Sequence, residues 1–373
     1  MIYWFYNTLL LIAGGYALLL MVLIIGWRRI ANQNWEMEKD LDGISIIIPA
    51  RNEADNIASL LNDLSAQTLN RKQFEIILVD DHSEDGTTEI AASFVLSDLS
   101  IISLDDAFGK KAAILKGVQA ARFERILTLD ADIRVGKDFL KIWQTTSQNF
   151  SLLAGPVKVR EGRGLLNQLQ LLDVAGMQAM TAAWFGFEKP VSCNGANLSF
   201  SKAAYLQIEQ NPKGRNLASG DDIFLLQSLA SKQKYRTGYL NRQEAIVSVN
   251  AESDWLSFLK QRVRWISKAT AYSSHHVQLL LIFIYVFNLL LLIGTICIFW
   301  HPAQLVLLTG AWVFKIFFEL LFLIPVLRFF SQTKALRYFL IVQGVHVFYT
   351  SVLGILGTFI PVKWKGRSIK YGQ

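Results

Sequence analysis

The chain has 373 residues, of which 52% are hydrophobic and 18% are charged, and its formal net charge is +7. This composition and a positive mean hydropathy place it among membrane proteins rather than among soluble two-domain proteins. Several basic residues flank apolar segments, so the positive charge favours a membrane surface as the partner, and no nucleic acid is expected.

The first segment, residues 1–27, has no charged side chain and is long enough to cross a bilayer core, which needs roughly 20 apolar residues. It lacks a basic start and a clear small-residue cleavage site, so we expect a signal anchor rather than a cleavable signal peptide. Arg28 and Arg29 follow it, and the positive-inside rule places them and the region beyond them in the cytoplasm. Cys193 and Cys297 then need no disulfide, and apolar packing is expected for both.

From residue 44, short β-branched apolar runs alternate with segments that carry apolar residues at helical spacing. Strands are expected at 44–50, 74–81, 99–104 and 125–132, and helices at 53–67, from a Ser83 cap to Phe94, and at 109–122. This order predicts an α/β fold with an open, mostly parallel central sheet, whose ligands bind at the carboxyl ends of the strands.

After residue 135 the alternation becomes less regular. The expected elements are a strand at 152–159, an amphipathic helix at 165–187, a turn into a short strand at 193–200 and a helix at 219–232. A basic, aromatic helix at 254–272 directly precedes the membrane segments and suits the headgroup interface.

Three more apolar segments follow, at 277–300, 303–327 and 338–362. The second contains Lys315 and Glu319, four residues apart and able to pair on one helical face, and the alternative to a span there is a buried hairpin arm. A full crossing by the third would place the basic tail outside, which the positive-inside rule disfavours. Either 338–362 re-enters the membrane or another span is interfacial.

Asp130 and Asp132 end the fourth expected strand, and on an extended segment their carboxylates would point to the same side and repel each other. A divalent cation such as Mg²⁺ or Mn²⁺ explains the pair, because hard cations favour carboxylate oxygens and a Mg²⁺ site often combines one or two carboxylates with substrate phosphates. The alternative is a solvated turn at the end of a strand.

Asp80 and Asp81 close the second expected strand. A carboxylate there can accept a hydrogen bond from the ring N–H of a nucleobase, and the alternative is an ordinary turn rich in Asp, Ser and Gly. Lys110 and Lys111 follow Gly109 and either contact a phosphate or are solvated.

Asp221 and Asp222 begin an apolar-periodic helix, for which one aspartate would suffice as a cap. The second could act as a general base that takes a proton from an attacking hydroxyl. The scattered histidines are expected to be structural or interfacial.

The segment QRVRW spans residues 261–265 and combines two arginines with a tryptophan. Arginine suits phosphate oxygens, and tryptophan suits stacking on a sugar or lipid face. The alternative is an interfacial helix whose arginines bind anionic lipids.

The order of these motifs is more specific than any one of them. Over residues 44–268 the chain resembles the membrane-bound family 2 glycosyltransferases in SIIIPARNE, ILVDDHSEDGT, GKKAAI, LTLDADI, CNGANLSF, SGDD and QRVRW, followed by a C-terminal membrane cluster. The resemblance implies a GT-A fold, a nucleotide-diphosphate sugar as donor, a divalent metal ion, and inversion at the anomeric carbon.

The resemblance also implies roles for individual residues. The nucleoside-lining turn is matched by Pro49, Ala50, Arg51 and Glu53, the uracil position by Asp81 with Asp80 beside it, and a donor-side lysine by Lys110. The Asp-x-Asp motif is matched by Asp130, nearer the sugar or ribose, and by Asp132, on the metal. The catalytic base is matched by Asp222, with Asp221 where glutamate is commoner, and the diphosphate and acceptor motif by Gln261, Arg262, Arg264 and Trp265.

The expected organisation is a transmembrane signal anchor (1–27), a linker (28–43), a cytoplasmic GT-A domain (44–250), an amphipathic interfacial helix (251–274), a C-terminal membrane domain of two or three helices (275–362) and a basic tail (363–373).

The acceptor is expected to be a membrane lipid, as in the ceramide-type and carotenoid- or hopanoid-type glucosyltransferases that the chain looks like. The first alternative is a processive polysaccharide synthase. Such an enzyme requires a channel for its product, and three or four membrane segments offer little material to build one. A second alternative is a non-catalytic membrane scaffold that retains the fold, and the presence of Asp132 and Asp222 argues against it. A transporter is disfavoured because paired, polar, broken helices are not apparent.

Overall fold

A computed structural model describes residues 2–35, 42–210, 221–269 and 275–356, with the backbone of 363–364 and 367–368. The chain forms two compact units. The helical unit comprises Met1–Arg28, Glu161–Ala183 and Ala251–Lys370. The sheet unit comprises Arg29–Arg160, Trp184–Asn250 and Tyr371–Gln373.

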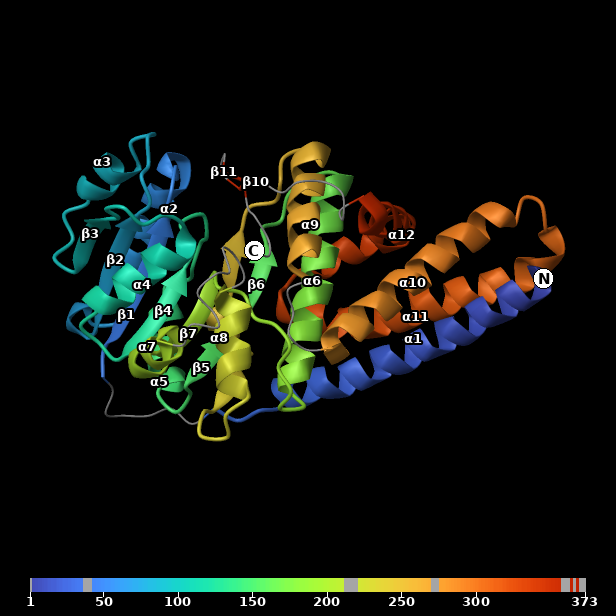
Figure 1. The fold of residues 1–373 in the computed structure, drawn as a ribbon, viewed down its shortest axis with the longest axis horizontal. Helices are drawn as coiled ribbons and strands as arrows, with labels where there is room; N and C mark the ends of the chain where they lie inside the picture. The colour runs from blue at the N-terminus through green and yellow to red at the C-terminus, as the bar shows by residue number, and fades with distance from the viewer. Residues whose placement is uncertain are drawn as a thin grey trace. The chain divides into compact units, whose positions relative to one another are not determined.

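The sheet unit is built on one seven-stranded sheet with the strand order β3-β2-β1-β4-β7-β5-β8 (Figure 1). Its strands are β1 (Ile44–Ala50), β2 (Phe74–Asp80), β3 (Leu99–Ser103), β4 (Arg125–Leu129), β5 (Leu152–Ala154), β7 (Asn197–Ser201) and β8 (Thr237–Tyr239). The first four run parallel, whereas β7 is antiparallel to its neighbours β4 and β5. The predicted α/β fold with a mostly parallel sheet is confirmed.

Helices cover the sheet because its central strands are apolar on both faces. They are α2 (Ala54–Ser65), α3 (Thr87–Ala92), α4 (Lys110–Ala120), α5 (Phe139–Ser147), α7 (Lys202–Glu209) and α8 (Asp221–Ala230), with short 3-10 turns at Arg71–Gln73 and Gln243–Ala245. Ile46 and Ile48 of β1 share a core cluster with α2, whereas Ile47, on the other face, meets α4. There, a Cβ on Gly117 would lie 2.6 Å from Cγ2 of Ile47, so glycine permits the close approach of α4.

Three local predictions differ from the structure. Helix α3 begins at Thr87 after Gly86, and the Ser83 hydroxyl accepts a hydrogen bond from the Asn52 backbone N–H at 3.0 Å instead of capping the helix. The strand expected over 152–159 is interrupted at Gly155-Pro156, and its second part, β6 (Val157–Val159), pairs in parallel with β9 (Val247–Val249). Strand β4 ends at Leu129, so the two following aspartates lie in a turn and not on an extended segment.

The helical unit contains four helices that are long and apolar enough to cross a membrane, over Ile2–Ala31, Val277–Cys297, Pro302–Phe329 and Thr333–Ile355 of the described residues. The elements of this unit are α1 (Ile2–Ala31), α6 (Leu165–Phe185), α9 (Trp255–Ala269), α10 (His275–Cys297), α11 (Leu305–Phe329), α12 (Phe339–Leu356), 3-10 turns at Pro302–Gln304 and Thr333–Tyr338, and the short pair β10 (Lys363–Trp364) and β11 (Arg367–Ser368).

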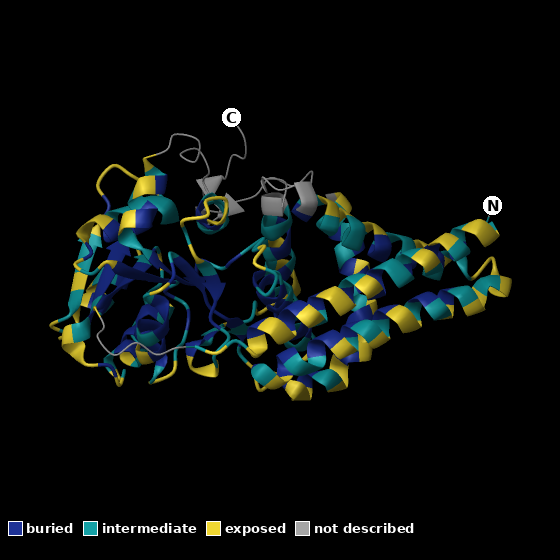
Figure 2. Ribbon diagram, turned by 90° about the horizontal axis from the view of Figure 1, so that it is seen from below, coloured by how far each residue is buried: buried dark blue, intermediate teal, exposed yellow. Residues whose placement is uncertain are grey.

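The long helices of this unit have outward faces that are exposed and apolar. Figure 2 shows exposed residues along them, in contrast to the buried strands of the sheet. Leu11 of α1, Leu279 of α10 and Val306 of α11 are 77%, 63% and 81% exposed, as lipid-facing side chains would be. The end of the last expected span, residues 357–362, and most of the basic tail lie outside the described residues.

A polar cluster is buried among α1, α11 and α12. Lys315 and Glu319 form the predicted ion pair on α11. The Tyr16 hydroxyl donates to Oε1 of Glu319 at 2.6 Å, and the Gln343 amide donates to Oε2 at 2.6 Å. Buried charges need such partners, and this cluster allows α11 to carry two charged residues inside an apolar bundle.

Candidate functional site

The acidic motifs of the sheet unit come together at one edge of the sheet. The parallel strands β1, β2 and β4 end there, and the antiparallel β7 begins there, since Asn197 pairs with Leu129. The four adjoining loops, 51–53, 81–86, 130–133 and 193–196, therefore emerge side by side. This is the edge at which open α/β sheets bind their ligands.

Asp81 is fixed below this edge by the backbone of a neighbouring loop. Its side chain is buried, and its Oδ2 accepts a hydrogen bond from the Gly109 N–H at 3.0 Å. Nη1 of Arg51 lies 3.9 Å from the same oxygen. Asp80 accepts from the Ser83 N–H at 3.2 Å. The carboxylate predicted to meet the nucleobase is thus held in one orientation.

His82, which the sequence suggested to be structural, closes the side of this loop. Its backbone has φ 57°, and its ring stacks on Phe108 with centroids 4.5 Å apart. Nε2 lies 2.9 Å from the Asp105 carbonyl oxygen, and Nδ1 lies 3.3 Å from Oδ1 of Asp81. The hydrogen bond with the Asp105 carbonyl raises the pKa of His82, and the Asp81 carboxylate adds to the rise.

Asp130 and Asp132 follow β4 and lie in an environment rich in negative charge. Nζ of Lys110, the first residue of α4, is 2.5 Å from Oδ1 of Asp130. Burial raises the pKa of Asp132 to about 6, and the nearby carboxylates of Asp130 and Glu53 add to the rise. Among the described residues, no group of three or more His, Cys, Asp or Glu side chains could hold a metal ion by itself.

Asp222, on α8, is tied to the same edge through the loop before β7. Its Oδ2 accepts a hydrogen bond from the Gly195 N–H at 2.9 Å, and its Oδ1 accepts one from the Ile223 N–H at 2.9 Å. The Gly195 carbonyl in turn accepts from the Thr128 hydroxyl of β4 at 2.9 Å. Asp222 is therefore tied through Gly195 to β4, the strand that Asp130 follows.

Gly195 also shows how closely the charged groups approach. A Cβ at this position would lie 3.4 Å from Oδ2 of Asp222 and 3.6 Å from Nζ of Lys110. The structure therefore brings together Lys110, Asp130 and Asp222. Gly195 and Thr128 were not predicted as site residues, although CNGANLSF was singled out as a motif; only the fold shows that its glycine joins α8 to β4.

The remaining predicted residues have other surroundings. Nζ of Lys111 forms an ion pair with Oε1 of Glu209 on α7, at 3.3 Å. The Asp221 side chain lies outside the described residues. The QRVRW segment lies on α9 of the helical unit, where the Arg262 guanidinium is buried against Asp173 of α6, with Nη2 2.7 Å from Oδ2.

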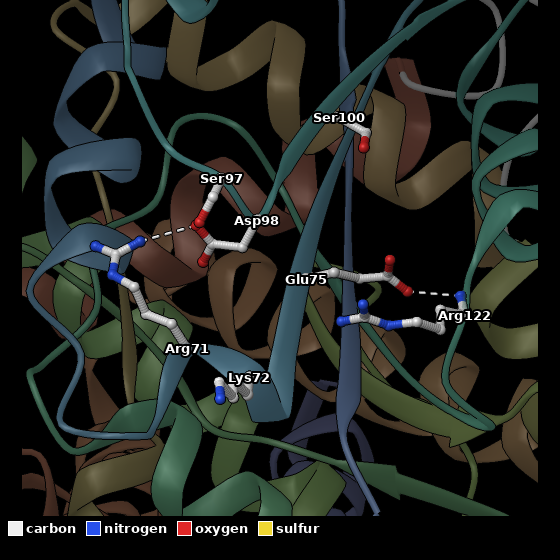
Figure 3. A pocket seen from close by; sticks show the side chains of 7 residues that line it. All are labelled: Arg71, Lys72, Glu75, Ser97, Asp98, Ser100 and Arg122. Atoms are coloured by element: carbon white, nitrogen blue, oxygen red, sulfur yellow. Dashed lines mark hydrogen bonds and ion pairs between the residues drawn. The ribbon is translucent and has the colours of Figure 1, made fainter.

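A cavity of about 340 Å³ lies at the opposite edge of the sheet, where β2 and β3 begin. Figure 3 shows the side chains that line it: Arg71, Lys72, Glu75, Ser97, Asp98, Ser100 and Arg122. Arg71 pairs there with Asp98 at 2.8 Å, and Glu75 accepts a hydrogen bond from the Arg122 N–H. It contains none of the acidic motif residues, so we do not regard it as the functional site.

Two family models match the chain. Glycosyl transferase family 2 matches residues 45–172, and glycosyl transferase family group 2 matches residues 125–342, more than half of the chain. A glycosyltransferase, AglE, from Haloferax volcanii is 35% identical over 107 residues, which are 28% of this chain and 35% of that protein. An undecaprenyl-phosphate 4-deoxy-4-formamido-L-arabinose transferase from Aeromonas hydrophila subsp. hydrophila is 36% identical over 99 residues, 26% of this chain and 30% of that one.

These matches span about a third of the relatives' own length. Among solved structures, a mannosyltransferase from Pyrobaculum calidifontis in complex with GDP-Man and Mn²⁺ aligns with a TM-score of 0.56 at 14% identity, over 95% of this chain and 99% of that one. That likeness shows a shared fold. The chain belongs to the family 2 glycosyltransferases, with a GT-A sheet domain and four helices suited to a membrane.

Proposed function

We propose that this protein is an inverting glycosyltransferase that moves a hexose or N-acetylhexosamine from a nucleotide-diphosphate sugar, a UDP-sugar, to a hydroxyl group of a membrane lipid. The observation that carries the proposal is the convergence of Lys110, Asp130 and Asp222 at the carboxyl edge of the sheet. Lys110, a cation, and Asp222, a potential base, lie next to Gly195, and Asp130, a potential metal ligand, pairs with Lys110.

The nucleoside would lie over the loops after β1 and β2. Pro49 and Ala50 end β1, Arg51 and Glu53 lie in the loop after it, and Asp81 projects from the loop after β2. The Gly109 amide holds Oδ2 of Asp81, and Oδ1 lies 3.3 Å from Nδ1 of His82. Because a carboxylate oxygen can accept more than one hydrogen bond, Asp81 could also accept the ring N–H of uracil. Asp80 supports the turn through its bond to the Ser83 N–H.

Asp130 and Asp132 would hold Mg²⁺ or Mn²⁺. The raised pKa of Asp132, caused by burial and by neighbouring carboxylates, indicates a place where a cation would remove repulsion. Two carboxylates are too few to saturate either ion, which fits a metal that completes its shell with diphosphate oxygens and water. The Mn²⁺ and GDP-Man of the structurally similar mannosyltransferase support this assignment. When bound, the ion would stabilise negative charge on the departing diphosphate.

Asp222 would be the general base. Backbone amides from Gly195 and Ile223 fix its two oxygens and still leave lone pairs for a proton from the acceptor hydroxyl. Attack by that hydroxyl from the face opposite the leaving diphosphate inverts the anomeric carbon. Lys110, beside Asp130, would contact the donor phosphates.

A lipid acceptor is supported by the four apolar helices and by the lipid phosphate in the name of one relative. We place the sheet unit in the cytoplasm of a multi-pass cell-membrane protein, following Arg28 and Arg29. Gln261, Arg264 and Trp265 of α9 would act at the diphosphate and acceptor end.

The test is to incubate the purified protein with UDP-glucose or UDP-N-acetylglucosamine, Mg²⁺ or Mn²⁺, and a lipid extract. We expect metal-dependent UDP release that is slow without lipid, where water is the acceptor, and much faster with lipid. We also expect a product whose mass exceeds that of a lipid by one sugar. A ladder of products differing by one sugar would instead identify a polysaccharide synthase. Absence of turnover with every nucleotide sugar, in a protein that folds, would favour the non-catalytic scaffold.

A further inference from the structure

The two arginines of QRVRW lie on different sides of α9. Arg262 and Arg264 are two residues apart, so their side chains leave the helix about 200° apart. Arg262 is only 5% exposed, and its Nε and Nη2 atoms both lie 2.7 Å from Oδ2 of Asp173 on α6. Arg262 is thus turned toward the interior of the helical unit.

Aromatic rings enclose the same guanidinium. Its carbon lies 4.6 Å from the ring centroid of Phe258 and 4.2 Å from that of Trp265. A guanidinium over an indole ring contributes a cation–π interaction as well as contact area. Nε2 of His346 on α12 lies 3.9 Å from the other oxygen of Asp173. The carboxylate therefore fixes the plane against which Trp265 rests.

The beginning of the motif is held from α6 in a second way. Gln261 donates to the Glu252 carboxylate at 2.6 Å and accepts from Nη1 of Arg262 at 2.5 Å. The backbone of Glu252 is bonded through its N–H and carbonyl to the Gln170 amide, at 2.8 and 3.0 Å. Gln170 and Asp173 are three apart on one face of α6, so one helical surface orients both Gln261 and Arg262.

We propose that Asp173 is a positioning residue for the acceptor end of the site: it fixes Arg262, and Arg262 fixes the indole of Trp265. Arg262 is then a support for Trp265 and not a ligand of the donor diphosphate, which changes the role predicted for it from the sequence. This inference rests on the proposed function, because it assumes that Trp265 meets the acceptor.

The test compares two metal-dependent reactions of the same full-length protein in detergent: transfer of sugar to added mixed lipid, and hydrolysis of UDP-sugar without added lipid. Asp173→Asn keeps the shape of the side chain and removes its charge. We expect kcat for transfer to fall about 10- to 100-fold, as for a displaced positioning group, while hydrolysis and the KM for UDP-sugar stay unchanged. A merely structural defect would lower both reactions together.

A double-mutant cycle tests whether Asp173 acts through Arg262. Arg262→Gln should cause the same loss as Asp173→Asn, and the double variant should lose no more than either one. The matched control is Asp98→Asn, which removes the ion pair with Arg71 in the sheet unit and should leave both reactions unchanged. If Asp173→Asn does not fold, the double variant, which leaves no unpaired buried charge, and Arg262→Lys carry the same prediction.

Two results would overturn the inference: normal transfer by Asp173→Asn, or a raised KM for UDP-sugar in Arg262→Gln alone, which would make Arg262 a donor ligand. Wild-type protein that neither hydrolyses nor transfers any sugar would contradict the proposed function instead. The two failures are therefore distinguishable.

Discussion

The two units use buried charge in opposite ways. In the helical unit two buried carboxylates each have a cation beside them: Glu319 has Lys315, and Asp173 has Arg262. At the edge of the sheet unit, Asp132 lies among carboxylates that repel its charge. Pairing offsets the cost of burying a charge, so loss of one partner is destabilising, whereas a carboxylate with a raised pKa among other carboxylates is a candidate ligand site. Substitutions in the two units should therefore have different consequences.

The largest effect is expected at the proposed base. Asp222→Asn keeps the hydrogen-bonding shape but removes the proton acceptor, so kcat should fall by about 10²- to 10⁴-fold, the usual contribution of a general base. Nucleotide binding, measured by calorimetry with UDP and Mn²⁺, should be unchanged. Turnover equal to that of wild type would show that another group takes the proton.

A large effect on stability, and little on chemistry, is expected in the membrane bundle. Lys315→Met leaves Glu319 buried without its cation, which should cost about 3–5 kcal/mol and lower Tm. The double variant Lys315→Met/Glu319→Gln should recover part of that loss. At temperatures where both variants are folded, UDP-sugar hydrolysis per folded molecule should match wild type. A loss of hydrolysis without a loss of stability would contradict the view that this ion pair serves the fold and not the chemistry.

Asp132→Asn should instead abolish a functional response and leave the stability of the fold intact. It abolishes the response to Mg²⁺ or Mn²⁺ by removing a proposed ligand. In the absence of metal it relieves repulsion from Asp130 and Glu53, so Tm should stay equal or rise. Differential scanning fluorimetry with and without Mn²⁺ measures both effects. A lower Tm without metal would mean that Asp132 stabilises the fold by a contact of its own.

Gly117→Ala tests how α4 supports Lys110. The added methyl would lie 2.6 Å from Ile47 and should destabilise the sheet unit by about 1–3 kcal/mol, as overpacked cores do. Gly136→Ala is the matched control, because a Cβ there meets nothing within 4 Å. Chemical denaturation of both variants gives the comparison, and equal stabilities would show that α4 can move outward freely.

The smallest effect concerns pH. The folded state raises the pKa of His82, so this residue stabilises the fold fully below its unfolded pKa of about 6.5 and loses that contribution as pH rises through the folded value. The Tm difference between wild type and His82→Asn should therefore be larger at about pH 6 than at about pH 8. A constant difference would mean that only the stacking on Phe108 matters.

Local pattern predicted most of the sheet unit. Strand β1 matches its expected range of 44–50, since a β-branched run leaves few alternatives. Ser83 was wrongly taken as a helix cap because a serine followed by acidic residues has the composition of a cap, and its actual partner, Asn52, is 31 residues away. Local sequence does not predict a helix boundary that depends on a residue distant along the chain.

The same limit applies to the site. The aspartates were visible as motifs, but what distinguishes Arg262 from Arg264 is Asp173, which is 89 residues before Arg262 and belongs to no motif. Likewise, the link from Asp222 to β4 runs through a glycine backbone, which has no side chain to signal a function.

Gly109 gives the site a further property. Its N–H holds Asp81, and the next residue along the chain is Lys110, whose ammonium reaches Asp130. With φ of 96°, this glycine occupies a backbone conformation that other residues adopt only with strain. One peptide unit thus connects the group that would recognise the base to the group that would meet the phosphates. A nucleotide with the wrong base would therefore misplace the lysine as well, and discrimination among donors would appear in turnover as much as in affinity.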